Sequence, residues 1–248
     1  MKHYDEIFRR RSFHIFRDAE PLTDGDIEKL EAFIKTVTPL YPDIKTETVI
    51  VPENETNCRR GGDRCILFYS EAKGDYLRNI GYIGEQIDLY LTSQNIGALW
   101  YGVGRPKERT RNGLGFVIMI VAARVAEGAF RKDMFKAKRK PLCDIWSGET
   151  LGVGEIARFS PSAVNSQPWA VENAEGKLKV YSNNRPGVRG LLPVPLVSYF
   201  NRIDMGIFLC ILETCLEREG YSFARELLSD TEDFKGEFVP AAVYAYSR

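Results

Sequence analysis

The stretch NIGYIGEQIDLYLTSQNIG, residues 79–97, has a counterpart in RIDMGIFLCILETCLEREG, residues 202–220. In both stretches apolar side chains recur at steps of three and four residues, which is the spacing of one face of an α-helix. Both end in a glycine, a common stop signal for a helix. The spacing therefore predicts two long helices, over residues 79–95 and 202–218.

Short apolar or β-branched runs on either side of these helices predict strands. The run FVIMIVAA at residues 116–123 lacks polar alternation and is typical of a strand buried on both faces. Pro240 indicates that the last strand lies at a sheet edge or that the proline is at a strand start. The expected strands cover residues 45–51, 64–69, 116–123, 177–181 and 239–246, and shorter helices cover residues 24–37 and 151–159.

The second half of the chain repeats the order of the first at a nearly constant offset. Gly97 and Gly220, which end the two long helices, are 123 residues apart, and the strands that follow start with the same offset. Chance agreement is the alternative, because the halves share few side chains, but duplication explains the offset better. We expect two tandem repeats, residues 1–143 and 144–248, that form one compact unit as the subunits of a homodimer do.

The composition is that of an ordinary globular protein, with 44% hydrophobic and 27% charged residues. Lys+Arg and Asp+Glu both number 34, which argues against a nucleic-acid or anionic membrane partner. The N-terminus lacks the apolar core of a signal peptide, and the apolar runs are too short to span a bilayer. Five cysteines without CxxC spacing and only two histidines argue against disulfides and a metal centre. We expect a cytoplasmic protein with reduced thiols.

Two basic clusters interrupt this balanced charge. RRRS at residues 9–12 combines guanidinium groups with a hydroxyl, and KRK at residues 138–140 forms the second cluster. Such groups make charge-assisted, partly bidentate hydrogen bonds to phosphate oxygens. The alternative for either cluster alone is a solvated basic surface.

The stretch SPSAVNSQPW at residues 160–169 is the most informative polar segment. Two prolines restrict its backbone, and Ser162, Asn165 and Gln167 carry hydroxyl and amide groups. Convergent donors and acceptors on a rigid turn suit the edge of a planar heterocycle. The alternative is a capped loop that leads into a strand, with Trp169 in the core.

Four segments together resemble the nitroreductase family. IFRRRSFHIF at residues 7–16 is similar to the family's N-terminal signature, and residues 160–169 resemble its Pro-Ser-Ser-x-Asn-x-Gln-Pro-Trp loop, with Ala163 replacing the second serine. NIGALWYGV at residues 95–103 and KRKPL at residues 138–142 resemble two further family segments. The resemblance covers nearly the whole chain and implies a nitroreductase-like α+β fold, with central antiparallel or mixed sheets flanked by helices.

The order of these segments departs from the family pattern. In ordinary members the Pro-Ser-Ser loop soon follows the Arg-Arg-Ser signature, but here that place holds TPLYPD at residues 38–43, with a bulky Tyr41. Family members are homodimers in which one site takes these two motifs from different subunits. Each half of this chain keeps one motif, as in the smaller fused, dimer-like branch of the nitroreductases. The resemblance therefore implies one cofactor site per chain, which a monomer completes.

The resemblance also implies a role toward FMN for each motif residue. Arg10 and Ser12 would hold the phosphate and ribityl chain with Arg11 beside them, and Lys138 and Arg139 would add charge. His14 stands where the family places a cation beside the flavin N1–C2 edge, and would supply that charge only when protonated. The remaining contacts, to the isoalloxazine, fall to Gly102, Pro161, Ser162, Ala163 and Asn165.

The implied activity is that of an FMN-dependent oxidoreductase, which passes hydride from NAD(P)H through the flavin to a nitroaromatic, quinone or similar acceptor. The flavin supplies the chemistry and the protein orients it, so no catalytic side chain is assigned. The alternative is a degenerate protein of the same fold that binds flavin or another ligand without turnover. The departures at His14 and Ala163 favour that alternative.

Overall fold

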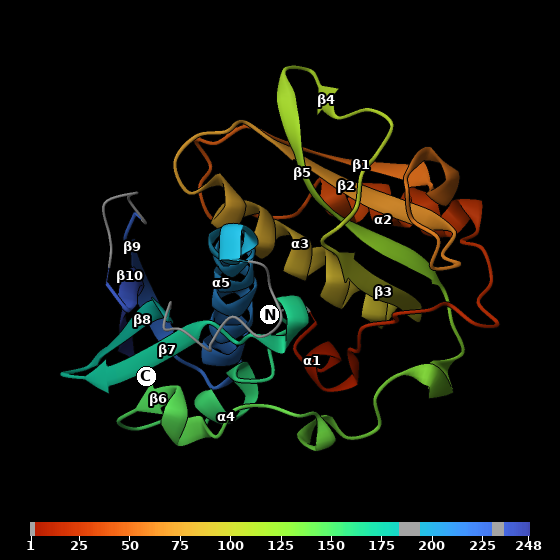
Figure 1. The fold of residues 1–248 in the computed structure, drawn as a ribbon. Helices are drawn as coiled ribbons and strands as arrows, with labels where there is room; N and C mark the ends of the chain where they lie inside the picture. The colour runs from red at the N-terminus through yellow and green to blue at the C-terminus, as the bar shows by residue number, and fades with distance from the viewer. Residues whose placement is uncertain (1–2, 184–193, 230–235) are drawn as a thin grey trace.

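Two five-stranded sheets and two long crossing helices form the α+β architecture (Figure 1). The computed structural model describes residues 3–183, 194–229 and 236–248. The first sheet has the order β1-β2-β5-β3, all antiparallel, with β4 paired to β5. Its strands are β1 (Thr46–Pro52), β2 (Arg64–Ser70), β3 (Ile96–Tyr101), β4 (Thr110–Arg111) and β5 (Leu114–Arg124).

The second sheet has the order β6-β7-β8-β10-β9 and is mixed, because β6 pairs with β7 in parallel while the other pairs are antiparallel. Its central part, β7-β8-β10-β9, follows the same chain order as β1-β2-β5-β3 in the first sheet. This shared connectivity supports the proposal of two repeats, whereas the boundary after residue 143 stays a prediction. The strands are β6 (Trp146–Ser147), β7 (Trp169–Ala174), β8 (Lys177–Asn183), β9 (Ser222–Leu227) and β10 (Phe238–Ser247).

The two long helices are α3 (Tyr76–Ser93), which connects β2 to β3, and α5 (Val194–Arg218), which connects β8 to β9. They cross in the middle of the molecule, between the two sheets (Figure 1). Gly81 and Gly206 lie at the crossing, where each faces the backbone of the other helix. Glycine is needed at both positions because a side chain would collide with that backbone.

The expected helix over residues 202–218 is right in type but begins too late, because α5 starts at Val194. The stretch NNRPGVRGLLPVP at residues 183–195 predicts a loop at the mouth of the pocket, to which the sequence assigns no role. Pro195 instead lies in the first turn of α5, where proline is well tolerated because its missing N–H costs no hydrogen bond. The rest of the proposed 183–195 loop, residues 184–193, lies outside the described residues. The helix expected over residues 24–37 is α2 (Asp24–Ile34), and two short helices are α1 (Glu6–Arg9) and α4 (Gly154–Ala157).

Of the two alternatives for Pro240, the strand start is confirmed and the sheet edge is wrong. β10 lies between β8 and β9, so it is an interior strand. The register with β8 shifts between Pro240 and Ala242. A bulge accommodates the missing N–H of proline there, near the start of the strand.

The N-terminal arm, residues 10–16, covers one face of the first sheet. Helices α2 and α3 cover the other face. Phe13 and Phe16 of the arm pack with buried residues of the sheet such as Leu99 and Val121. The N–H of Phe13 donates to the carbonyl oxygen of Ala98 at 3.0 Å, and Ser12 forms a parallel bridge with Ala98. The arm thus runs along β3, the last strand in the β1-β2-β5-β3 order, and Arg10 and Ser12 line the same cavity as Pro161 and Ser162 of the second half.

All five cysteines are free; four are buried and Cys143 is exposed. Among the described residues, the helices are all too short or too polar to cross a membrane.

Candidate functional site

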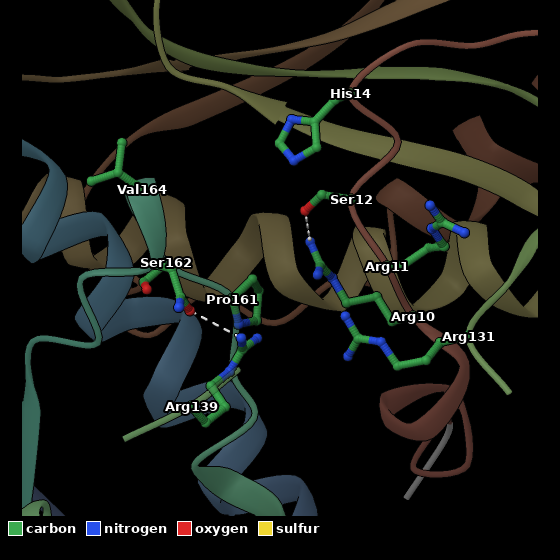
Figure 2. A pocket seen from close by; sticks show the side chains of 10 residues that line it. Arg10, Arg11, Ser12, His14, Arg131, Arg139, Pro161, Ser162 and Val164 are labelled. Carbon is green, nitrogen blue, oxygen red and sulfur yellow. Dashed lines mark hydrogen bonds between the residues drawn. The ribbon is translucent and has the colours of Figure 1, made fainter. Parts of the chain in front are cut away.

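Two adjoining cavities, of about 510 and 420 Å³, lie between the N-terminal arm, β3, the 160–167 loop and α5. The larger is lined by basic and polar side chains, and the smaller is mainly apolar. The two share six residues and therefore form one continuous site; the shared residues are Arg10, Ser12, His14, Pro161, Ser162 and Val164 (Figure 2).

Arg10 is buried and anchored by a carboxylate on α3. Its Nε donates to Asp88 Oδ2 at 2.7 Å, and its Nη2 lies 3.5 Å from Ser12 Oγ, at the cavity (Figure 2). Trp100 Nε1 donates to the same Asp88 oxygen at 2.9 Å. Burial lowers the pKa of Arg10, but the carboxylates of Asp88 and Glu85 raise it by more, so the net shift is upward. Arg10 therefore stays charged, with Nε occupied and the Nη groups available.

Glu85 of α3 is fully buried next to the ion pair of Arg10 and Asp88. Neither of its carboxyl oxygens has a hydrogen-bond partner among the described residues. Burial, followed by the neighbouring Asp88, raises the pKa of Glu85 well above its ordinary value. Asp88 is the nearer counter-charge of Arg10, because its Oδ2 lies 2.7 Å from Arg10 Nε while Glu85 Oε1 lies 4.0 Å from the same atom.

Arg131 and Arg139 supply positive charge without a carboxylate partner among the described residues. Burial, and then Arg10 and Arg11, lower the pKa of Arg131. Burial, and then Arg131 and Arg10, lower the pKa of Arg139 to about 10. Arg139 Nε is also buried without a hydrogen-bond partner. Buried like charges repel one another unless an anion compensates them, so this end of the site suits an anion.

Arg11 differs from the other arginines. Its side chain points away from Arg10 and Arg131 in Figure 2, and its Nη1 donates to the carbonyl oxygen of Ala129 at 3.0 Å. It lines the rim of the basic cavity. Arg11 therefore contributes to the local potential more than to direct contact.

The loop on the opposite wall has a strained backbone. Val164, Asn165 and Gln167 have φ angles of 47°, 59° and 50°. A left-handed conformation is rare for a β-branched residue such as Val164, and strain of this kind persists only where the surroundings enforce it. Here Arg139 Nη1 donates to Asn165 Oδ1 at 2.9 Å, and the N–H of Gln167 donates to Ser162 Oγ at 3.0 Å.

The buried carboxyl group of Asp204, on α5, forms hydrogen bonds with the same loop. Asp204 accepts the N–H of Ala163 with both carboxyl oxygens, at 3.1 and 3.0 Å, and the hydroxyl of Ser166 lies 3.4 Å from Oδ2. Burial raises the pKa of Asp204 to about 8, although the Ala163 and Ser166 hydrogen bonds lower it. Its side chain also lines the apolar cavity.

The apolar cavity lies between β3 and α5. Trp100 lines its wall, and a β-carbon at Gly102 would lie 2.6 Å from Cε1 of Phe200, so glycine permits close packing at this turn. Arg60 lies at one side, with its guanidinium carbon 5.7 Å from the ring centre of Tyr101. The other apolar lining residues are Leu99, Val103, Ile118, Ala163, Leu196, Ile203 and Ile207.

Comparison with known proteins identifies the family. A family model described as "Putative TM nitroreductase" matches residues 2–215. The chain belongs to this nitroreductase family. A search of the curated proteins found no match.

One solved structure shares the fold over nearly the whole chain. A crystal structure described as a putative nitroreductase from Thermotoga maritima MSB8 is 19% identical with a TM-score of 0.62, and covers 99% of this chain and 94% of that one. A structure described as a putative NADH dehydrogenase/NAD(P)H nitroreductase from Parabacteroides distasonis ATCC 8503 is 13% identical with a TM-score of 0.41, and covers 57% of this chain and 99% of that one. The first of these structures confirms the nitroreductase-like α+β fold expected from the sequence. Membership of the family makes the chain an oxidoreductase of the nitroreductase type.

The structure of this nitroreductase brings together all but one of the site residues named from the sequence. The exception is Lys138, whose side chain is exposed and lies outside both cavity linings, while its carbonyl oxygen accepts from Arg139 and Asn165. The lining also contains residues that the sequence did not single out. The main ones are Arg131, Phe200 and Asp204, together with Trp100, which lies within the family-like segment 95–103.

Proposed function

We propose that this nitroreductase binds one FMN between its two halves and uses NAD(P)H to reduce a nitroaromatic, quinone or similar acceptor. The observation that carries the proposal is one continuous site with a basic end and an apolar end. When bound, the flavin supplies the hydride chemistry. The side chains of this chain bind it, orient it and exclude water.

The basic end suits a phosphate. Arg10, Arg131 and Arg139 come from three separate segments, and the last two are half-buried cations whose pKa values are lowered by partial burial and by neighbouring arginines. A phosphate dianion would relieve this repulsion and accept the free guanidinium donors, including the unpaired Arg139 Nε. Ser12 adds a hydroxyl at the junction of the two cavities.

The apolar end suits a planar ring system. Trp100, Ile118 and Phe200 give it hydrophobic walls, while Ser162 and His14 place polar groups at its junction with the basic end. A mostly apolar pocket with a few fixed polar groups is the usual environment of an aromatic cofactor. His14 is exposed, so its imidazole reaches solvent as well as the site.

The corresponding position in the other half is filled, which supports a single site per chain. Asn79 accepts the N–H of Tyr41 at 2.9 Å, just as Asp204 accepts the N–H of Ala163, so Tyr41 stands where the site has the small Ala163. Arg78 is buried nearby, and its Nη1 donates to the hydroxyl of Tyr41 at 2.9 Å. These two large side chains occupy the space that a second ring system would need.

The proposal is tested by reconstituting the purified chain with FMN and adding NADH or NADPH without oxygen. We expect the flavin absorption to bleach, and menadione or nitrofurazone to restore it with steady NAD(P)H oxidation. A yellow protein that neither nicotinamide bleaches would instead support the non-catalytic flavin-binding alternative.

A further inference from the structure

Asp204 is placed to control the geometry of the loop that forms one wall of the site. It lies on α5, is almost completely buried, and directs both carboxyl oxygens at the N–H of Ala163. Ala163 is followed by Val164 and Asn165, both in the left-handed region. A fixed hydrogen bond just before these strained residues holds the loop in a conformation that it would otherwise leave.

The other half of the chain shows what this contact requires. Asn79 of α3 accepts the N–H of Tyr41 at 2.9 Å, and its amide nitrogen donates to the carbonyl oxygen of Tyr41 at 3.3 Å. Asn79 and Asp204 lie two residues before Gly81 and Gly206, the glycines that face each other where the helices cross. An uncharged amide therefore makes at one position the contact that a carboxyl group makes at the other.

We propose that Asp204 is the positioning residue of the 161–167 loop, and that its acceptor oxygen, not its charge, sets the affinity of the site for FMN. This inference rests on the proposed function. Asp204 acts through Ala163: when the loop is held, Pro161 and Ser162 face the cavity and Asn165 meets Arg139. Without the acceptor, the buried N–H of Ala163 loses its partner and the loop relaxes.

Two substitutions separate the acceptor from the charge. Asp204→Asn cannot ionise but keeps one acceptor oxygen, as Asn79 does, whereas Asp204→Leu has a similar volume and no acceptor. Asn79→Leu is the matched control, because it removes the equivalent contact from the loop around Tyr41. Each variant is examined in two ways: hydrogen exchange of the Ala163 amide without added flavin, and FMN affinity from fluorescence quenching.

For Asp204→Leu we expect exchange of the Ala163 amide to accelerate by about tenfold or more, and FMN affinity to fall by a similar factor. Asp204→Asn should restore both quantities to near the wild-type values. Asn79→Leu should accelerate exchange at Tyr41 and leave FMN affinity unchanged. The inference is overturned if Asp204→Leu leaves exchange at Ala163 unchanged, if Asp204→Asn is as defective as Asp204→Leu, or if Asn79→Leu weakens FMN equally.

The two proposals fail in distinguishable ways. If the wild-type chain binds no FMN, the proposed function is wrong and the statement about affinity falls with it. The exchange measurement on the flavin-free protein still decides whether Asp204 positions the loop.

Discussion

Gly81 of α3 and Gly206 of α5 face each other, and each lies against the carbonyl oxygen of the residue three positions before the other. A β-carbon at Gly81 would lie 2.0 Å from the carbonyl oxygen of Ile203, and one at Gly206 would lie 1.9 Å from that of Arg78. Such a reciprocal contact is characteristic of two-fold symmetric interfaces. It brings α5 close enough to α3 for Ile203 and Asp204 to line the cavity that also contains Arg10.

Gly206→Ala should destabilise the protein, because the added methyl group meets backbone atoms that cannot rotate away. Overpacking of this kind costs about 1–3 kcal/mol, and contact with a helix backbone places the expected loss at the upper end. Urea unfolding followed by circular dichroism measures it. Gly128→Ala is the control, since a β-carbon there would meet nothing within 4 Å; equal stability of the two variants would show that the helices do not cross at Gly206.

Arg131→Gln should weaken FMN while leaving riboflavin binding nearly unchanged, because only FMN carries the phosphate. One charge-assisted contact contributes about 1.5–3 kcal/mol, or roughly ten- to a hundredfold in affinity. Without FMN, the variant should be as stable as the wild type or more so, since the substitution removes a half-buried cation that repels Arg10 and Arg139. Fluorescence titration and thermal unfolding measure the two effects.

Lys132→Gln is the matched control for Arg131→Gln. Lys132 is the next residue and carries the same charge, but its side chain is exposed and lies outside the basic cavity. A comparable loss of FMN affinity in both variants would show a diffuse effect of charge and would remove Arg131 from the site. Arg10→Ala is a poorer test, because it also leaves Asp88 buried without its cation.

Arg78→Met should lower stability without changing FMN affinity. Arg78 donates to the hydroxyl of Tyr41 and to the carbonyl oxygens of Leu228 and Ala241, at 2.9, 2.8 and 3.2 Å. Removing these donors from a buried position should cost about 2–4 kcal/mol. Urea unfolding and flavin titration measure the two effects; a changed FMN affinity would mean that Arg78 belongs to a cofactor site.

Asp204→Asn should alter the pH dependence of stability. The pKa of Asp204 is raised to about 8 in the folded protein, from an ordinary value of 3.8. The folded state therefore holds this proton more tightly than the unfolded state, and the associated stability, full below about pH 4, is lost as the pH rises to about 8. Arg10, Arg60 and the His14 imidazole line the same cavity, and Ser166 faces the carboxyl group directly.

Because asparagine does not titrate, the variant does not lose this stability as the pH rises. The free energy of unfolding of Asp204→Asn minus that of the wild type should increase with pH between about 4 and 8, by up to about 1.4 kcal/mol per pH unit, and level off above. Urea unfolding at successive pH values measures the difference. A difference that does not change with pH would show that Asp204 titrates normally.

The sequence predicted most of the fold, because helix spacing and apolar runs are local signals. Residues 79–95 and 116–123 were placed correctly to within a few residues, because the apolar residues of each segment and their spacing are enough to predict its burial. The predictions of local structure failed where packing against the rest of the molecule determines the conformation. Pro240 lies near the start of its strand, as one alternative had it, but the strand is interior and a bulge accommodates the proline; Pro195 lies in the first turn of α5 instead of ending a loop.

The site could be predicted only where it rests on contiguous motifs. Residues 10–14 and 161–165 carry recognisable patterns, and the structure places them on facing walls. Arg131 had no such pattern: it reaches the site because its N–H donates to the carbonyl oxygen of Arg9 at 2.9 Å. Asp204 is one of several polar residues of α5, and only its contact with Ala163 distinguishes it from the others.

The central claim, one FMN per chain held by its phosphate between the two halves, is tested most directly by titrating the full-length protein with FMN and with riboflavin. The titration follows the quenching of flavin fluorescence on binding, so one experiment gives both the stoichiometry and the affinity. We expect saturation at one FMN per polypeptide, with riboflavin weaker by roughly ten- to a hundredfold. Two equivalent FMN molecules per chain, or equal affinity for FMN and riboflavin, would contradict the account.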